Sequence, residues 1–348
     1  MIVFSYKERR TINCLVAEQQ AENVLLLYQI RNIDSFLGEK LVMKILVTGG
    51  SGFLGSHVSD ALSEAGHAVS IYDVRRSPYK RVGQKMIVGD ILDQPSLSKA
   101  LTGFDCVYHF AGIADIDECS SNPIDTVKYN ILGTVNLLEA SRQAGIKRFV
   151  FGSSAYVYSN SGYFYRSSKQ ACESFIENYH ELFGLEYTCL RYGSLYGTRS
   201  DERNSIYRLI QQALRDGCIT YHGTGEELRE FIHVRDAAEI SVKILAPKFA
   251  NQHITLTGNE KMRYHDLLEM IREMVGSSVT IEIKPSLRKA HYKVTPYNFS
   301  PKLGSKLVNN PHIDMGQGLL QCMAEIYEKI HHEMIEEGGL LIDRKSSL

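Results

Sequence analysis

Tyr165 and Lys169 are the two residues of this sequence whose types and spacing most directly suggest catalysis. Four residues apart on a helix, their side chains lie on one face and can interact. A nearby ammonium group favours the phenolate and lowers the pKa of a tyrosine from about 10 toward neutral pH. Tyr165 is therefore a candidate general base that Lys169 activates. Such pairs also occur on helix surfaces without a function, but of the 20 tyrosines only Tyr165 has a lysine four residues later.

Ser154 is the third candidate catalytic residue. It follows an apolar stretch at 148–152 that predicts a strand, and its hydroxyl can bind the same substrate oxygen that Tyr165 deprotonates. Serines at strand ends also commonly do no more than satisfy backbone groups. Ser154 is assigned to the site because Tyr165 and Lys169 follow it closely in the sequence.

A glycine-rich segment predicts where a cofactor binds. Residues 44–48 have the character of a strand, and Gly49, Gly52 and Gly55 follow it with a spacing of three. Such glycines allow unusual dihedrals, close approach of a ligand to the backbone, and tight packing of the next helix on the strand. The N-terminus of that helix offers free N–H groups and a positive dipole end to a pyrophosphate. On its own the glycine triad is a weak signal for a dinucleotide site.

Asp73 strengthens the dinucleotide interpretation. It ends the stretch 68–73, at the distance from the glycines where a carboxylate bonds the hydroxyls of the adenosine ribose. A carboxylate there repels a 2′-phosphate, so Asp73 favours NAD over NADP. Arg75 and Arg76 work in the opposite direction, because guanidinium groups bind phosphate.

The elements that must position these residues alternate along the chain. The pattern predicts strands at 44–48, 68–73, 85–88, 105–110 and 148–152, and helices at 53–65, 95–101, about 120–143 and about 165–183. This order is typical of an α/β protein with a doubly wound parallel sheet. Ligands bind at the carboxyl edge of such a sheet. Residues that follow its strands are therefore candidates for cofactor contact, namely Asp90, Ile91, Phe110, Ala111 and Gly112. Glycines at such positions are also ordinary turn formers.

Composition argues against several other classes of function. The 348 residues are 44% hydrophobic and carry a formal net charge of -1, which provides no field for nucleic acid or a membrane surface. No apolar run is long enough to span a membrane. Seven cysteines without a Cys-x-x-Cys pair or a histidine cluster argue against a disulfide framework and against a metal site. We expect a soluble protein of the reducing cytoplasm.

Several motifs together resemble those of the extended short-chain dehydrogenase/reductases over about residues 43–310. They are TGGSGFLG at 48–55, Asp73, GDI at 89–91, HFAG at 109–112, YNILGT at 129–134, SSAYVY at 153–158 and the Tyr165–Lys169 pair. Within that family the sequence is most similar to the nucleotide-sugar epimerases of the UDP-glucose 4-epimerase type. The resemblance implies a Rossmann domain over 43–192 and a smaller C-terminal α/β substrate lobe over 193–335. Residues 1–42 would be an extension of unknown role, and 336–348 a tail.

The resemblance also implies roles for individual residues. Ser194 would contact the sugar, Arg229 in the run REFIHVRD the diphosphate, and Arg288 a second phosphate, while Tyr297 would limit the size of the sugar. A homodimer would form through the helices near 120–143 and 165–183, with Ile124, Val127, Phe175 and Ile176 as exposed apolar candidates. NAD would contact Gly49, Gly52, Phe53, Leu54, Gly55, Asp73, Asp90, Ile91, Phe110, Ala111, Gly112, Asn130, Lys169 and Tyr192.

The residues after Ser154 favour one reaction within this family. Relatives that dehydrate the sugar carry an Asp-Glu pair there and the decarboxylases a glutamate, whereas this chain has Ala155 and Tyr156. Elimination needs an additional acid, so we expect NAD-dependent epimerisation of a nucleotide-diphosphate sugar, with UDP and carbon 4 favoured. A nucleotide-sugar reductase or dehydratase and a dinucleotide-sensing protein remain as alternatives. The segment 155–164 is short for the family, which predicts a pocket open to sugars bulkier than glucose.

Overall fold

The computed structural model describes residues 42–258, 261–285, 291, 294 and 296. Arg288, Tyr297, residues 1–41 and the tail 336–348 lie outside the described residues. Within the described ranges, no helix combines the length and the apolar character needed to cross a bilayer.

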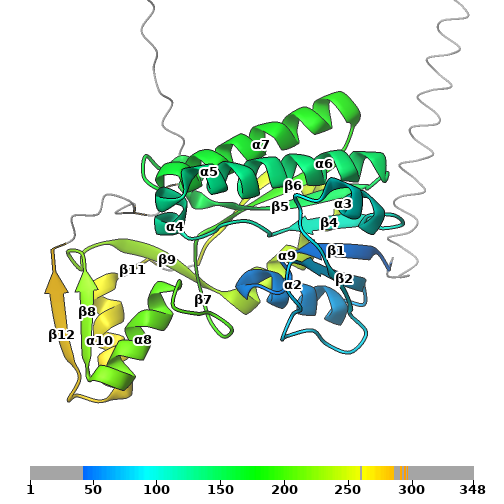
Figure 1. Ribbon diagram of the computed structural model, residues 1–348. Helices are drawn as coiled ribbons and strands as arrows, with labels where there is room; N and C mark the ends of the chain where they lie inside the picture. Colours follow the sequence, from blue (N-terminus) through cyan, green and yellow to red (C-terminus); the bar gives the residue numbers. More distant parts are fainter. Residues whose placement is uncertain (1–41, 259–260, 286–290, 292–293, 295, 297–348) are drawn as a thin grey trace, which may run out of the picture. The chain divides into compact units, whose positions relative to one another are not determined.

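A seven-stranded sheet forms the centre of the described chain (Figure 1). Its order is β10-β6-β5-β4-β1-β2-β3, and all neighbouring strands are parallel. The chain proceeds outward from β1 in one direction and from β4 in the other, which confirms the predicted doubly wound sheet. The bounds are β1 (Lys44–Thr48), β2 (Ala68–Asp73), β3 (Lys85–Val88), β4 (Cys106–His109), β5 (Arg148–Ser154), β6 (Glu186–Tyr192) and β10 (Gln252–Leu256).

Alternating side chains of β1 enter two separate cores, one on each face of this sheet. Leu46 packs in a core with Leu138, whereas Ile45 and Val47 pack in another core with Leu62. Figure 1 shows α6 and α7 on the first face and α2 and α9 on the second. We call this sheet with its flanking helices the large half. Its helices are α2 (Phe53–Glu64), α3 (Gln94–Ala100), α6 (Gly133–Gln143), α7 (Tyr163–Phe183), α9 (Val234–Lys243) and the 3₁₀ turn η3 (Pro247–Phe249).

The helix predicted over 120–143 is divided in the structure. A short helix α4 (Ile116–Ser121) ends at Asn122, and Pro123 begins a new helix that continues to the end of α6. Proline lacks a backbone N–H, which suits it to the first position of a helix and not to the interior. The new helix starts as α5 (Pro123–Asp125) and passes through a π-helical stretch, η1 (Thr126–Leu132).

A second group of elements, which we call the small lobe, has two short sheets and a core of its own. The chain leaves the large half after β6, returns to it for α9 and β10, and leaves again. Residues 234–256 therefore interrupt the segment predicted as the substrate lobe. One sheet contains β7 (Ser194–Tyr196), β9 (Leu228–His233) and β11 (Lys261–Arg263), the other β8 (Cys218–His222) and β12 (Thr280–Lys284), with helices α8 (Ser205–Asp216) and α10 (Tyr264–Val275).

Candidate active site

A cavity of about 1880 Å³ lies at the carboxyl ends of the central strands. Its wall combines the segments that follow β1, β2, β4 and β5 with parts of α8, β8 and β9 from the small lobe. It brings together most of the predicted site residues: Gly49, Gly52, Phe53, Leu54, Gly55, Asp73, Asp90, Ile91, Phe110, Ala111, Gly112, Ser154, Tyr165, Lys169, Tyr192, Ser194 and Arg229.

The turn between β1 and α2 has glycines at positions where the surrounding backbone packs too closely for a side chain. Gly49 has φ +70°, and a Cβ on it would lie 2.5 Å from the backbone nitrogen of Ala111. A Cβ on Gly55 would lie 2.3 Å from the carbonyl oxygen of Gly49. The N-cap residue Gly52 has no side chain with which to cap the helix. The first N–H groups of α2 are thus left for an anion, and the turn fits the pyrophosphate of a dinucleotide.

The carboxylate of Asp73 is held in place at the end of β2. The backbone N–H of Ser51 donates to its Oδ2 at 3.0 Å and that of Arg75 to its Oδ1 at 3.3 Å. Ser51 belongs to the glycine turn, so this bond ties the carboxylate to the pyrophosphate cradle. A carboxylate fixed beside that cradle is placed to accept hydrogen bonds from ribose hydroxyls.

Lys169 joins the catalytic helix to the central sheet. Its Nζ donates to the carbonyl oxygen of Gly152 in β5 at 2.8 Å and lies 5.8 Å from the centre of the Tyr165 ring. Burial lowers the pKa of Lys169, because an ammonium group is poorly stabilised away from water. The amine is therefore fixed beside the Tyr165 ring.

Ser154 ends β5 on the cavity wall. The backbone N–H of Tyr156 donates to its Oγ at 3.3 Å, which leaves the hydroxyl hydrogen to point toward a ligand. The preceding residue, Ser153, donates to Glu173 at 2.6 Å, and Arg191 binds both carboxylate oxygens of Glu173, at 3.0 and 2.7 Å. This buried network anchors the end of β5 to α7 and β6. Sequence reasoning missed Glu173, although it lies one helical turn after Lys169.

The same carboxylate takes part in a group with metal-ligand chemistry. Glu173, Cys189 and His253 lie close enough to share an ion. Arg191 already occupies both oxygens of the carboxylate. We therefore assign this group to a structural ion-pair network.

Tyr156 and His291 form part of the wall beside Tyr165. The Tyr156 ring meets the Tyr165 ring edge to face at 6.1 Å, and its hydroxyl lies 2.7 Å from Nδ1 of His291. Burial, assisted by the charge of Arg229, lowers the pKa of His291, so its ring is neutral at pH 7. The short segment expected to leave this side open thus supplies a tyrosine to it, through the 3₁₀ turn η2 (Ala155–Tyr158). Neither residue was predicted to line the sugar pocket.

Arg229 is presented to the cavity from β9. Its side chain is buried, its NH1 donates to the carbonyl oxygen of Leu228 at 3.0 Å, and its guanidinium lies 5.5 Å from the Tyr264 ring centre. A buried guanidinium on a cavity wall suits a phosphate group, which it can bind through two parallel hydrogen bonds. Ser194 lies at the start of β7 on the same wall.

Tyr192 offers its ring to the cavity and not its hydroxyl. The hydroxyl lies 2.6 Å from Oγ of Ser241, and burial raises its pKa. The ring lies 6.3 Å from that of Phe110. Both side chains line the cavity, where an apolar surface suits the flat ring of a nicotinamide.

Asn130 was predicted to contact the cofactor. It is buried in the π-helical stretch and does not lie on the cavity wall. Its side chain accepts from the N–H of Ile113 at 2.7 Å and donates to the carbonyl of Ile113 and to Ser168 Oγ, both at 3.0 Å. Asn130 therefore fixes the segment that follows β4, and a direct contact with the cofactor stays a prediction.

The fold and the site together define a class of enzyme. A parallel sheet with a glycine turn after β1, a carboxylate at the end of β2 and a Ser-Tyr-Lys set at β5 and α7 is the arrangement of a dinucleotide-dependent short-chain dehydrogenase/reductase. Residues 45–256 match the model of the NAD dependent epimerase/dehydratase family. This chain belongs to that family, and the family, fold and cofactor predicted from the sequence are confirmed.

Individual relatives cover about three quarters or more of this chain. A UDP-glucose 4-epimerase from Corynebacterium glutamicum is 28% identical over 308 residues, 78% of this chain and 92% of that protein. A UDP-N-acetyl-alpha-D-glucosaminuronate decarboxylase from Bacillus cytotoxicus is 27% identical over 315 residues, 80% of this chain and 96% of that protein. The structure of a UDP-N-acetylglucosamine 4-epimerase from Methanobrevibacter ruminantium with UDP-N-acetylmuramic acid has a TM-score of 0.68 at 27% identity, covering 74% of this chain and 90% of that one.

Proposed function

We propose that this protein is an NAD-dependent epimerase that inverts carbon 4 of a UDP-sugar. The observation that carries the proposal is that Ser154, Tyr165 and Lys169 line the same cavity as the glycine turn. Ser154 is followed by Ala155 and Tyr156, at the positions where an acid would serve elimination or decarboxylation. UDP is favoured because the epimerase relatives are named for UDP-sugars.

The chemistry of the site follows from these three side chains. Tyr165 removes the proton from a sugar hydroxyl while Ser154 donates a hydrogen bond to the same oxygen. Lys169, held by the Gly152 carbonyl, stabilises the negative charge on the tyrosine oxygen. When bound, NAD supplies the acceptor of the hydride and, on its return, the donor. The keto-sugar turns over in the pocket so that the hydride returns to its other face, which inverts the carbon, and Tyr165 gives its proton back to the substrate oxygen. No bond to a leaving group breaks, so no further acid is needed.

The small lobe holds the rest of the substrate in this proposal. Arg229 binds the diphosphate through its guanidinium, and Ser194 contacts the sugar. We place the change from cofactor binding to substrate binding near residue 192, where β6 of the large half ends. Arg288 and Tyr297 keep their proposed roles as a second phosphate ligand and a limit on sugar size.

A panel of nucleotide sugars tests the reaction. The purified protein is incubated with UDP-, GDP-, CDP- and dTDP-sugars without added cofactor, and the products are separated by chromatography. We expect interconversion of UDP-sugar epimers at unchanged mass and without net formation of NADH. Accumulation of a keto-sugar with loss of water would identify a dehydratase, loss of CO₂ from a uronate a decarboxylase, and stoichiometric consumption of NADH a reductase.

We also propose that the enzyme is a homodimer formed through α7 and the helix that begins at α5. Exposed apolar side chains gather there, Ile124 being 78% and Phe164 49% exposed, with Val127 and Phe175 also exposed. Ile176, which was expected on this face, is instead buried in the core. It lies four residues after the buried Cys172 and so belongs to the inward side of α7.

Light scattering at micromolar concentration tests the dimer. Wild type should give twice the chain mass and Phe175→Glu the mass of one chain, because a charge cannot be buried at an apolar contact without a partner. Leu214→Glu is the matched control, since Leu214 is an exposed leucine of α8 in the small lobe. A wild-type monomer, or equal loss of dimer in both variants, contradicts this interface.

We further propose that the protein works in the cytoplasm. The five cysteines among the described residues are free thiols, and four of them are buried. Reduced thiols persist in that compartment. Cell fractionation with an antibody to the chain checks this directly, and recovery with a secreted or membrane fraction would refute it.

A further inference from the structure

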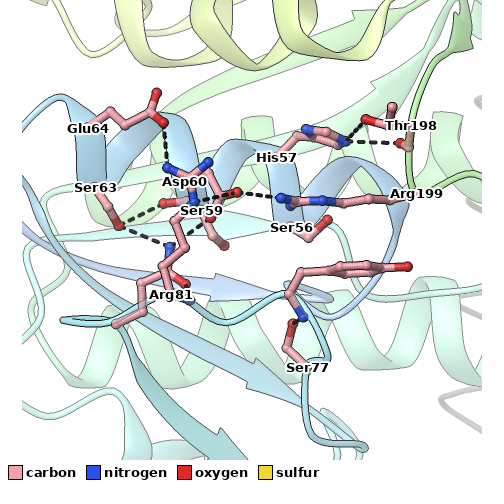
Figure 2. Close-up of polar contacts among 12 residues, drawn as sticks. Ser56, His57, Ser59, Asp60, Ser63, Glu64, Ser77, Arg81, Thr198 and Arg199 are labelled. Carbon is pink, nitrogen blue, oxygen red and sulfur yellow. Dashed lines mark hydrogen bonds and ion pairs between the residues drawn. The ribbon is translucent and has the colours of Figure 1, made fainter.

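One side of α2 carries an ionic cluster, centred on the buried Asp60, that the proposed reaction does not use. Figure 2 shows Asp60 between Arg81 and Arg199. One carboxylate oxygen, Oδ2, lies 3.0 Å from Arg81 Nε and 2.8 Å from Arg199 NH2, and Oδ1 accepts from Gln84 at 3.1 Å. Asp60 is buried on the helix whose first turn faces the pyrophosphate cradle. A buried carboxylate with this many donors fixes the groups around it.

The partners of Asp60 come from two loops that are distant in sequence. Arg81 and Gln84 belong to the adenosine loop, which we define as residues 74–84. Arg199 belongs to the lobe loop, residues 197–204, which leads into α8 of the small lobe. The two loops also contact each other, because the Arg199 guanidinium lies over the Tyr79 ring at 4.7 Å.

The helix holds the lobe loop at a second point. Nε2 of His57 lies 3.0 Å from the carbonyl oxygen of Thr198, as Figure 2 shows. The next residue, Arg199, has φ +65°, a left-handed backbone conformation that residues other than glycine rarely adopt. Asp60 and Tyr79 hold the guanidinium of this residue, and so hold the loop in its unusual path.

Both loops also contribute residues to the wall of the cavity. Val74 and Arg75 follow Asp73 on one side, and Ser200 and Asp201 line the cavity from the other. The pKa of Asp201 is lowered chiefly by hydrogen bonds from Arg203 and in smaller part by the charge of Arg75. Arg75 and Asp201 thus line the same cavity with opposite charges.

We propose that Asp60 and Arg199 are positioning residues that tie the adenosine loop to the lobe loop and thereby slow the release of NAD. They touch neither substrate nor cofactor, and they act through Arg75, Ser200 and Asp201. The inference rests on the proposed function in one respect, because an epimerase uses the same NAD twice in each turnover and must retain it. A reductase has to exchange its cofactor and gains nothing from such a tie.

Release of NADH tests the proposal without any sugar substrate. Protein loaded with NADH is mixed with excess NAD, and the decay of NADH fluorescence gives the dissociation rate. Asp60→Asn should raise that rate roughly tenfold or more, because the two loops are then no longer tied together beside the cavity and changes of affinity act mainly on dissociation. Asp60→Asn should also purify with less bound NAD than wild type.

Two further variants separate positioning from general damage. Glu64→Gln removes the other partner of Arg81, a carboxylate with 63% of its side chain exposed, and should leave NADH release unchanged. Arg199→Lys keeps a charge for Asp60 but loses the flat contact with Tyr79, and should give an intermediate rate. In both Asp60→Asn and Arg199→Lys, saturating NAD should restore wild-type kcat.

The outcomes distinguish this inference from the proposed reaction. Wild-type release rates in Asp60→Asn and Arg199→Lys overturn it, as does an equal acceleration in Glu64→Gln. A kcat that saturating NAD does not restore also overturns it. If Asp60→Asn fails to fold, Arg199→Lys decides alone. If the protein epimerises no nucleotide sugar, the proposed function fails, but the NADH dissociation rates still show whether Asp60 and Arg199 slow the release of the cofactor.

Discussion

The large half and the small lobe form their shares of the cavity in different ways. In the large half, Gly49, Gly52 and Gly55 occupy one turn, and Tyr165 and Lys169 one helical face. In the small lobe, Ser194 and Arg229 come from separate strands of a sheet that also includes β11. Short-range spacing therefore fixes the glycine turn and the tyrosine-lysine pair, whereas long-range packing brings Ser194 and Arg229 to the same cavity.

The two regions also differ in how deeply their strands are buried. Every residue of β5 is buried, whereas β12 has four exposed residues and one of intermediate exposure. A fully buried apolar side chain contributes roughly 1.5–3 kcal/mol relative to an exposed one. Ser154 thus ends a strand that is buried along its whole length, whereas β12 of the small lobe is exposed along most of its length.

Tyr165→Phe should produce the largest effect and tests whether the large half carries the general base. Loss of the general base should lower kcat by roughly 10²–10⁴, while the dissociation rate of NADH stays at the wild-type value. Tyr163→Phe is the matched control, because Tyr163 is an exposed tyrosine two residues earlier on the same helix. Steady-state kinetics on the active UDP-sugar measures both, and normal turnover in Tyr165→Phe would remove the assignment of the base.

Arg229→Gln should have the next largest effect and concerns the small lobe alone. Removing a charged donor to the diphosphate should raise KM for the UDP-sugar roughly 10–100-fold, with bound NAD unchanged. Arg263→Gln is the control, because Arg263 is an exposed arginine that pairs with Glu226 in the same lobe. An Arg229 variant that loses NAD but keeps its KM would contradict the division of labour between the two regions.

The sequence was sufficient wherever a site residue belonged to a local motif. The glycine turn, Asp73 and the Tyr165–Lys169 pair were predicted because their spacing alone fixes their geometry. The division of the 120–143 helix was missed because apolar periodicity continued past Pro123. The bonds of Asn130 to Ile113 and Ser168 were not predicted, since they depend on how a π-helical stretch lies against α7.

Contacts across long sequence distances had no signal in the sequence. His291 reaches Tyr156 from 135 positions away, and Arg199 reaches Asp60 from 139. Neither pair has a spacing that a helix or strand would dictate, so tertiary packing alone brings them together. The sequence therefore predicts the large half in more detail than the walls that close it.

Asp73→Ser should have a smaller effect, confined to cofactor choice. The variant removes the charge that repels a 2′-phosphate, so the preference for NAD over NADP should narrow by about tenfold, equivalent to about 1.4 kcal/mol. Competition of the two dinucleotides for the purified apoprotein, read by fluorescence, gives the ratio. A wild-type protein that already prefers NADP would show that Arg75 and Arg76 outweigh the carboxylate.

The smallest expected effect is a dependence of stability on pH that originates in the large half. His109 is completely enclosed, with Thr48 Oγ1 at 2.7 Å and Thr134 Oγ1 at 2.9 Å, and burial lowers its pKa to about 3. Its value in the unfolded chain is near 6.5. Between these two values the unfolded chain binds more protons, so stability falls as pH drops from about 6.5, by at most about 1.4 kcal/mol per pH unit.

His109→Asn should remove part of this acid sensitivity at some cost to stability at neutral pH, because asparagine is smaller and cannot bridge the same two hydroxyls. The Tm of wild type should drop by a few degrees more than that of the variant between pH 7 and pH 5. His265→Asn in α10 is the control and should follow wild type, since its side chain is half exposed. If His265→Asn flattens the pH profile as much as His109→Asn, the acid sensitivity does not originate in His109 and is not confined to the large half.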